Sequence, residues 1–261
     1  MLISFYAAPR ITARFWPVVM RNWLVWKKLA LPSIVGNIAE PLITLVAFGY
    51  GVGALVGQIG DRPYIEFLAS GSVTASAALA ATFEALYSAY SRMAVQKTWD
   101  SILNAPIALD DIVFAEMLWA AMKALFSVGA ILVVIFLLGI SRAPAMLLAV
   151  PVLGLVGITF ASIALVFNAL AKGYDFFTYY FTLVITPMTF LSGVYFPVAQ
   201  MPGWLQSVAQ VLPMTAAVDL VRPLVLGEAP AEVLRPLLVL VAYASGGYYL
   251  ALVLTRRRFF G

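Results

Sequence analysis

The chain has 261 residues, of which 63% are hydrophobic and only 11% are charged, and its mean hydropathy is +0.98. Soluble domains average about 45–50% apolar and about 25% charged residues, so this chain has too little polar surface to coat a soluble domain and is predicted to be a membrane protein. It contains no His and no Cys, which excludes imidazole and thiol catalysis, haem or zinc sites built on those residues, and disulfide bonds.

Residues 10–31 are predicted to form an amphipathic helix in the membrane interface rather than a signal peptide. At about 100° per residue, four of its cations fall within about 40° of one another: Arg10, Arg14, Arg21 and Lys28. Four large apolar residues lie roughly opposite: Phe15, Val19, Trp23 and Trp26. The cations are expected to face headgroups and the tryptophans acyl chains. The helix is either a juxtamembrane anchor or an anchor that also touches a cytoplasmic partner.

Six stretches reach the length of about 20 mostly apolar residues that a spanning helix needs. They are 32–56, 64–90, 112–140, 145–170, 176–196 and 234–255. An even number of spans puts both termini on one side, where eleven Lys and Arg fall, against four on the other side. By the positive-inside rule both termini are predicted to be cytoplasmic. The net charge of +4 is therefore attributed to topology signals and not to a nucleic-acid-binding face.

The connection between the second and third spans contains a short apolar helix. Residues 95–104 can form about two to three turns before Pro106 stops them. Trp99, Ile102 and Leu103 then share a face by i, i+3, i+4 spacing. Because this connection is too charged to be buried in lipid, a protein groove is expected to cover that face.

Glu84 and Lys123 are predicted to lie inside the membrane, where an ionised side chain costs several kcal/mol unless it is paired or hydrated. At about 1.5 Å per residue, Glu84 lies about 12 Å from Arg92 along its helix, and Lys123 about 16 Å from Ile112. These similar depths predict that the two side chains face each other or share a water-filled cavity with Glu116. The pair either fixes the helix register or contacts a transported polar group.

Two regions near the fifth span complete the pattern. Residues 174–181 are rich in Tyr and Phe, which is typical of an interfacial aromatic belt and also compatible with a stacking surface for a sugar or acyl chain. The 38 residues of 196–233 contain apolar runs of about 10 residues, broken by Pro202, Pro213 and Pro223. Such runs are too short to span and predict re-entrant or interfacial pieces on the extracytoplasmic side.

Three classes of membrane protein fit this architecture. A membrane enzyme is disfavoured because the chain lacks His, Cys and closely spaced paired carboxylates. A secondary transporter is disfavoured because the two halves show no internal repeat. A permease driven by a separate ATPase explains both the short helix at 95–104 as a docking element and the absence of a G-x-x-x-x-G-K-[ST] motif.

Three stretches resemble ABC-2 type permeases, and more narrowly the nodulation-protein J family of exporter permeases. They are SFYAAPRITARFWPVVMRNWLVWKKLALPSIVGNIAEPLI (4–43), ATFEALYSAYSRMAVQKTWDSILNAPIALDDIVFAE (81–116) and FLSGVYFPVAQMPGWLQSVAQVLPMTAAVDLVRPLVLG (190–227). The resemblance implies an all-α polytopic ABC-2 (type V) exporter fold in the bacterial inner membrane. It also implies that two copies of the permease pair with two copies of a cytoplasmic ABC ATPase, which binds ATP and Mg²⁺.

This chain itself is then expected to bind no cofactor, metal or nucleic acid, to catalyse no reaction, and to contact membrane lipids. The implied cargo is an amphiphile such as a lipo-chitooligosaccharide. A polysaccharide or a drug is the alternative cargo, and an ATP-independent channel or scramblase is the alternative class.

The resemblance also assigns candidate site residues. The coupling region, 93–106, would enter the ATPase through Val95, Gln96, Lys97, Thr98, Trp99, Asp100, Ile102 and Leu103. The substrate pathway would include Glu84, Lys123, Tyr179 and Tyr180. The exit region, 197–227, would include Pro197, Pro202, Trp204 and Arg222.

Overall fold

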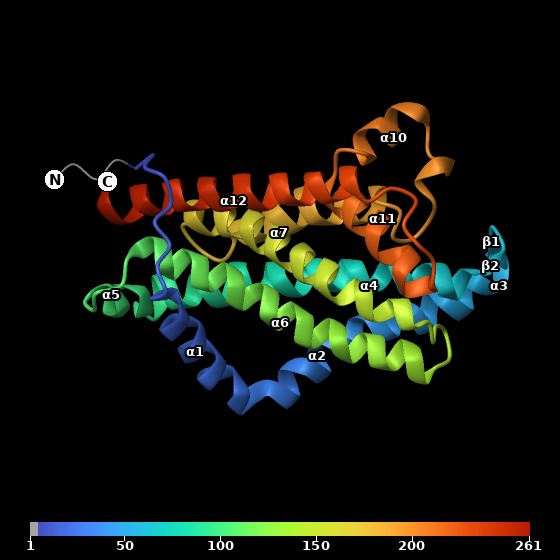
Figure 1. Ribbon diagram of the computed structural model, residues 1–261, viewed down its shortest axis with the longest axis horizontal. Coiled ribbons are helices and arrows are strands. Elements are labelled where there is room, and N and C mark those ends of the chain that lie inside the picture. Colours follow the sequence, from blue (N-terminus) through green and yellow to red (C-terminus); the bar gives the residue numbers. More distant parts are fainter. Residues whose placement is uncertain (1–4) are drawn as a thin grey trace.

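Long apolar stretches fold as helices in a bilayer because a helix satisfies its own backbone hydrogen bonds without water. The computed structural model describes residues 5–261, apart from the side chains of residues 37, 38 and 40, and its helices lie side by side in an elongated bundle (Figure 1). The longest helices are α4 (Tyr64–Phe83), α6 (Leu109–Leu137), α7 (Ala149–Leu170) and α12 (Leu234–Phe260).

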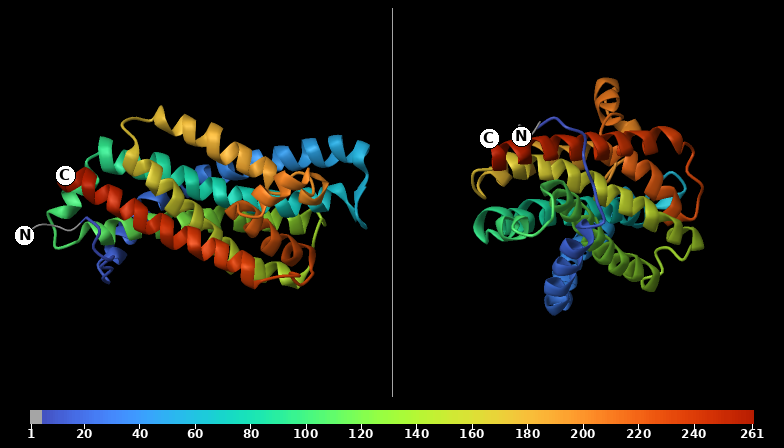
Figure 2. Two further views of the ribbon diagram at one scale, coloured as in Figure 1. Left: turned by 90° about the horizontal axis from the view of Figure 1, so that it is seen from above. Right: turned by 60° about the vertical axis from the view of Figure 1, so that its left-hand side comes forward.

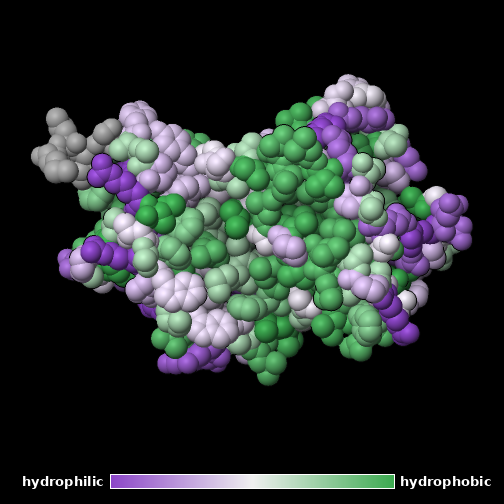
Figure 3. Space-filling model, in the orientation of Figure 1, coloured by the Kyte–Doolittle hydropathy of each residue, from purple (hydrophilic) through white to green (hydrophobic). Residues whose placement is uncertain are grey.

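The two ends of the bundle differ in content (Figures 1 and 2). Helix α5 (Thr98–Leu103) and both ends of the described chain lie at one end, which we call the termini end. A short antiparallel pair, β1 (Gln58–Ile59) and β2 (Arg62–Pro63), lies at the opposite end, the hairpin end, with α10 (Gly203–Ala209) nearby. On the face seen in Figure 3, a broad hydrophobic band separates hydrophilic groups at the two ends, as expected of a protein that crosses a membrane.

The core lies between α4, α6, α7 and α12, and small residues allow these helices to approach closely. A Cβ added at Gly247 of α12 would lie 2.7 Å from the Ser162 hydroxyl oxygen of α7. A Cβ added at Gly157 of α7 would lie 3.0 Å from the Ala121 Cα of α6. Larger residues at either position would push the helices apart, as at other close crossings of membrane helices.

Five helical stretches of the described residues are long and apolar enough to cross a membrane, and a sixth results if one bent helix pair counts as a span. These five are Phe15–Val56, Tyr64–Val95, Leu109–Leu137, Pro144–Leu170 and Leu234–Phe260. The last of them includes the predicted span 234–255, and Pro144–Leu170 begins with a 3-10 helix, η5 (Pro144–Leu148).

The predicted span 176–196 is the exception, because its helix is shorter than a full span. This helix comprises α8 (Phe176–Tyr180), the π-helical segment η6 (Phe181–Ile185) and α9 (Thr186–Leu191). It ends at Leu191, and the turn that follows contains Gly193 with φ +78°, a conformation that glycine adopts without the steric cost of a Cβ.

The N-terminal helix begins later than the predicted 10–31. Its segments are α1 (Phe15–Trp26), a 3-10 turn η1 (Lys27–Leu29), α2 (Ala30–Val46), a π-helical η2 (Ala47–Val52) and α3 (Gly53–Val56). The residues before α1 are not helical, because the backbone N–H groups of Arg10 and Thr12 donate to the carboxylates of Asp110 and Asp111 at 2.9 and 2.7 Å.

The prediction that the tryptophans of this helix face acyl chains is wrong. Trp26 stacks on Phe126 of α6, with ring centroids 5.0 Å apart and an interplanar angle of 14°. Val18 and Val19 of α1 pack against Trp119, also on α6. Helical periodicity identifies an apolar face but not what covers it, and here α6 covers it.

The connection between α4 and α5 also differs in detail from the prediction. The helix continues beyond residue 90 through two π-helical segments, η3 (Glu84–Ser88) and η4 (Ser91–Val95). Lys97 then adopts φ +56°, a left-handed conformation that interrupts a right-handed helix. Helix α5 therefore begins at Thr98 and not at residue 95.

The stretch 197–227 forms a short 3-10 helix, η7 (Val198–Gln200), followed by α10 and α11 (Pro213–Leu226). Helices α10 and α11 meet at 84°. Helix α11 packs against α4, α7 and α12, whereas α10 projects from the bundle (Figure 1).

Candidate functional site

A cluster of buried charges lies at the termini end, where α6 meets the π-helical continuation of α4. The Arg92 guanidinium binds the Glu84 carboxylate at 2.9 Å and the Glu116 carboxylate at 2.5 Å. The Lys123 ammonium binds the second oxygen of Glu84 at 2.7 Å, which confirms the predicted pairing of these two residues. The carboxylates are almost fully buried, with side-chain exposed fractions of 3% for Glu84 and 1% for Glu116.

Polar groups from two further helices complete the cluster. The indole N–H of Trp99 on α5 donates to Glu116 at 3.2 Å, and that of Trp119 donates to Glu84 at 3.0 Å. The side-chain amide of Asn22 on α1 donates to Glu116 at 3.4 Å. Buried charges are tolerated only when they are paired and hydrogen-bonded, so the cluster fixes α1, α4, α5 and α6 relative to one another.

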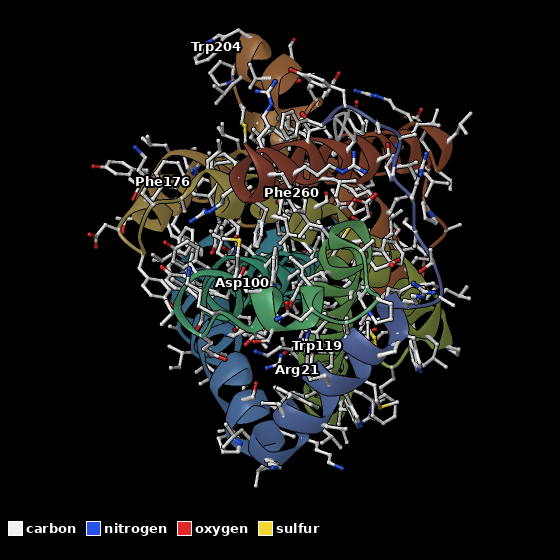
Figure 4. The ribbon with its side chains drawn as sticks, turned by 90° about the vertical axis from the view of Figure 1, so that its left-hand side faces the viewer. Arg21, Asp100, Trp119, Phe176, Trp204 and Phe260 are labelled. Atoms are coloured by element: carbon white, nitrogen blue, oxygen red, sulfur yellow. The ribbon has the colours of Figure 1, made fainter. Side chains whose placement is uncertain are left out.

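A cavity of about 570 Å³ lies beside the cluster, between α1, α2 and the bundle. Figure 4 looks onto this end of the molecule, with Arg21 and Trp119 close together beneath α5. The cavity is lined by charged and hydroxyl side chains together with apolar and aromatic ones, among them Arg21, Ser33, Glu84, Tyr87, Ser91, Arg92, Trp119, Lys123 and Tyr174. Such a mixed lining can hold a polar group against an apolar surface.

Helix α5 presents two different faces. Trp99 is buried within this chain, where it stacks on Phe259 of α12 with centroids 6.1 Å apart, and Ile102 and Leu103 are half-buried against the core. The expectation that a partner's groove covers Trp99 is therefore wrong. The candidate coupling residues that face outward are Val95, Gln96, Lys97 and Asp100, with Thr98 half-buried; Figure 4 shows Asp100 on the outer side of α5.

The two candidate pathway tyrosines of α8 point in opposite directions. Tyr180 is 1% exposed and packs on Phe167 at 4.3 Å between centroids, whereas Tyr179 is 65% exposed. Neither is among the residues that line the cavity beside Glu84 and Lys123. Consecutive helical residues differ by about 100° in direction, so the two tyrosines lie in different surroundings, and their role in a substrate pathway stays a prediction. The aromatic residues that do reach the cavity include Tyr87 and Tyr174, which are stacked 6.0 Å apart.

The candidate exit residues have different environments. The half-buried Arg222 of α11 donates through its guanidinium to the Gly193 carbonyl at 2.6 Å and to the Ser70 hydroxyl at 3.2 Å. It also lies 3.7 Å above the ring of Phe67, so it holds α11 against α4 and the turn after α9. Trp204 is instead exposed on the projecting α10 (Figure 4). Pro197 and Pro202 directly precede η7 and α10, respectively.

Substitution of Arg222 by lysine is expected to lower the stability of the folded chain by about 1–3 kcal/mol. Lysine keeps the charge but cannot reach both oxygen acceptors while stacking on the Phe67 ring. The midpoint of unfolding in an SDS titration of the purified protein measures this loss. Arg235→Lys is the matched control, because Arg235 is exposed and bonds only Gln210 among the described residues. An equal midpoint for both variants would contradict the assignment.

A second polar network, which the sequence analysis did not identify, closes the termini end. Arg256 of α12 binds the Asp110 carboxylate at 2.5 Å and the Ala7 carbonyl at 2.6 Å. The backbone N–H groups of Arg10 and Thr12 also bond Asp110 and Asp111. These contacts hold residues 5–12 against the start of α6 and the end of α12. The adjacent Asp110 and Asp111 in the sequence could have indicated this network, because the first turn of a helix favours carboxylates.

The bundle, its buried charges and its cavity agree with a match that covers most of the chain: the model of the ABC-2 type transporter family aligns with residues 13–226. The chain belongs to this family, and it is a membrane transport permease subunit. It is 45% identical over 238 residues to Nodulation protein J of Rhizobium meliloti (strain 1021), with 91% of each chain covered. The relation drawn from the three sequence stretches is thereby confirmed.

Two other relatives are similar over nearly the whole chain. Nodulation protein J of Rhizobium leguminosarum bv. trifolii is 44% identical over 255 residues, which cover 98% of this chain and 97% of the relative. The Inner membrane transport permease YadH of Escherichia coli (strain K12) is 23% identical over 248 residues, which cover 93% of this chain and 96% of the relative.

Proposed function

We propose that this chain is the permease of an exporter in the bacterial inner membrane that moves an amphiphile outward, and that a separate cytoplasmic ABC ATPase drives it. Two copies of the permease pair with two copies of the ATPase, which binds ATP and Mg²⁺. The observation that carries this proposal is the construction of α5: its inner face bonds the buried charge cluster through Trp99, while Gln96, Lys97 and Asp100 are exposed on the outer side.

Helix α5 is the coupling element in this proposal. Its outer surface, with Gln96, Lys97 and Asp100, contacts the ATPase. A displacement of α5 acts on the Trp99 indole, which bonds Glu116. Because Glu116 binds Arg92 and Arg92 binds Glu84, the displacement reaches the wall of the cavity through direct contacts.

The termini end faces the cytoplasm in this proposal. Arg14 directly precedes α1, Arg21, Lys27 and Lys28 lie in α1 and η1, and Arg257 and Arg258 lie in the last turn of α12. The positive-inside rule then places both termini in the cytoplasm. The hairpin end, with α10 and its exposed Trp204, is extracytoplasmic, and the bent pair of α10 and α11 is the exit region.

The cavity supports an amphiphilic cargo. Its inner wall carries Glu84, Arg92 and Lys123, and its outer part is formed by Val25 and Leu29, which are exposed apolar residues of the N-terminal segment. A polar head could bind the charged wall while its tail stays against Val25 and Leu29. The similarity to Nodulation protein J favours a glycolipid or lipo-oligosaccharide over a polysaccharide or a drug.

Co-purification of the tagged permease with candidate ABC ATPases tests this proposal. We expect a stable complex with equal numbers of permease and ATPase chains, and stimulation of ATP hydrolysis by the cargo. Absence of any stable ATPase complex, together with transport in liposomes that contain the permease but no nucleotide, would favour the channel or scramblase alternative.

A further inference from the structure

The cavity beside the charge cluster carries an excess of positive charge. Among the described residues that line it, the charged side chains are three cations, Arg21, Arg92 and Lys123, and one carboxylate, Glu84. Glu84 binds Lys123, and Arg92 is balanced by Glu116, which lies behind it. Every charged side chain of the cavity wall except Arg21 is therefore paired in a salt bridge.

Arg21 forms no salt bridge among the described residues, although Glu116 lies close enough to interact with its charge. Its guanidinium donates to the neutral side-chain amide oxygen of Asn22 at 2.9 Å, and it forms none of the salt bridges of this end. An arginine has five N–H donors in a rigid fork that matches the oxygens of phosphate, sulfate or carboxylate groups. Arg21 therefore has donors available on the side of the cavity.

The surroundings of Arg21 add hydroxyl donors and an apolar border. Ser33 accepts a hydrogen bond from the Trp26 indole at 3.1 Å, which leaves its own hydroxyl proton able to donate. Ser91 similarly accepts a bond from the Gln96 amide at 2.9 Å. On the outer side, Leu29 lies exposed next to the cavity.

We propose that this cavity binds the anionic headgroup of an amphiphile, a phosphate or sulfate ester, with Arg21 as the residue that recognises the charge. The proposal deepens the proposed function by naming the class of headgroup, and its source is either a membrane lipid or the cargo. It concerns binding to the permease alone, so it does not depend on the ATPase.

Binding of lysophosphatidic acid to the purified permease in a neutral maltoside detergent tests the proposal. Trp26 and Trp119 line the cavity, so tryptophan fluorescence reports occupancy. We expect saturable binding that the Arg21→Gln substitution weakens about tenfold or more, the loss expected for a hydrogen bond to a charged group. Arg21→Lys is expected to retain most of the affinity, because it keeps the charge.

Lys28→Gln is the matched control. Lys28 is an exposed cation of the same segment that does not line this cavity, so its loss is expected to change the affinity by about twofold at most, through screened charge alone. Equal weakening by Lys28→Gln and Arg21→Gln would overturn the proposal, as would unchanged binding to Arg21→Gln.

Two further probes separate the sources of the anion. Monoacylglycerol, which has the same chain but no phosphate, is expected to bind much more weakly than lysophosphatidic acid. Equal affinity for both lipids would show that the site does not recognise the headgroup charge, and would overturn the proposal. Inorganic phosphate is expected to bind weakly, and an affinity equal to that of lysophosphatidic acid would show that the site binds a free anion and not an amphiphile.

Competition between lysophosphatidic acid and the exporter's cargo, once the cargo is known, assigns the site to the cargo. Lack of competition assigns it to membrane lipid.

Discussion

Replacement of Arg92 by glutamine is expected to destabilise the folded permease by about 3–5 kcal/mol, the range seen when one partner of a buried ion pair is removed. The guanidinium is the only described cation that binds both Glu84 and Glu116. Without it, Glu84 keeps Lys123 as a cationic partner, whereas Glu116, among the described residues, keeps only the hydrogen bonds from the Trp99 indole and the Asn22 amide. The SDS concentration at the midpoint of unfolding measures the loss.

The exposed ion pair at the hairpin end provides the matched control. Arg62 binds Glu228 at 2.6 Å, but the side chains are 37% and 55% exposed, and exposed pairs contribute about 0–1 kcal/mol. Arg62→Gln is therefore expected to shift the midpoint only slightly. The double variant Arg92→Gln with Glu116→Gln should recover part of the stability. It removes the carboxylate that Arg92→Gln leaves without a cation, and Glu84 stays paired with Lys123. Equal losses in Arg92→Gln and Arg62→Gln would refute the structural role of the cluster.

Reversal of charge at Asp100 is expected to weaken binding of the partner ATPase about tenfold or more without unfolding the permease. Asp100 lies on the outer face of α5, where Asp100→Lys leaves every buried contact of Trp99 intact. A tenfold change equals about 1.4 kcal/mol, which is within the range of single interface residues. The fraction of ATPase retained on the tagged permease measures binding, and the SDS midpoint should change by about 0.5 kcal/mol or less.

Asp175→Lys is the control for this experiment, because Asp175 is an exposed acid in the loop between α7 and α8 and not in α5. Retention of the ATPase by Asp100→Lys would refute the role of the outer face of α5. Trp99→Ala cannot serve this purpose. Removal of this buried indole, which also bonds Glu116, is expected to cost about 3–5 kcal/mol, so loss of the ATPase would then follow from unfolding.

The helices and the central ion pair could be predicted from sequence because both follow from local geometry. A rise of about 1.5 Å per residue places Glu84 and Lys123 at similar depths, and the structure joins them at 2.7 Å. The central role of Arg92 could not be predicted in the same way. Arg92 lies beyond the predicted span 64–90, and nothing in the sequence indicates that the helix continues through the π-helical η4.

The remaining errors have one physical origin: a sequence pattern identifies an apolar face but not the surface that covers it. Trp99 and Trp26 both lie on faces that the periodicity identifies. The first is covered by Phe259 of the last helix and the second by Phe126 of α6. Contacts between residues so far apart in the chain depend on how the helices are arranged. For the same reason the sequence could not show that Tyr180 faces the core and Tyr179 faces away from it.

The π-helical segments occur in some helices of the bundle and not in others. Helices α6, α7 and α12 are uninterrupted, whereas η2, η3, η4 and η6 interrupt the helices of the first, second and fifth predicted spans. A π turn contains one extra residue, and its migration along the chain rotates the side chains it passes by about 100°. Glu84 and Arg92 lie in η3 and η4, so such a rotation would turn them away from Glu116 and Lys123 on the uninterrupted α6. Breaking the ion pairs of the charge cluster and bending the helix that contains η3 and η4 would then be one movement.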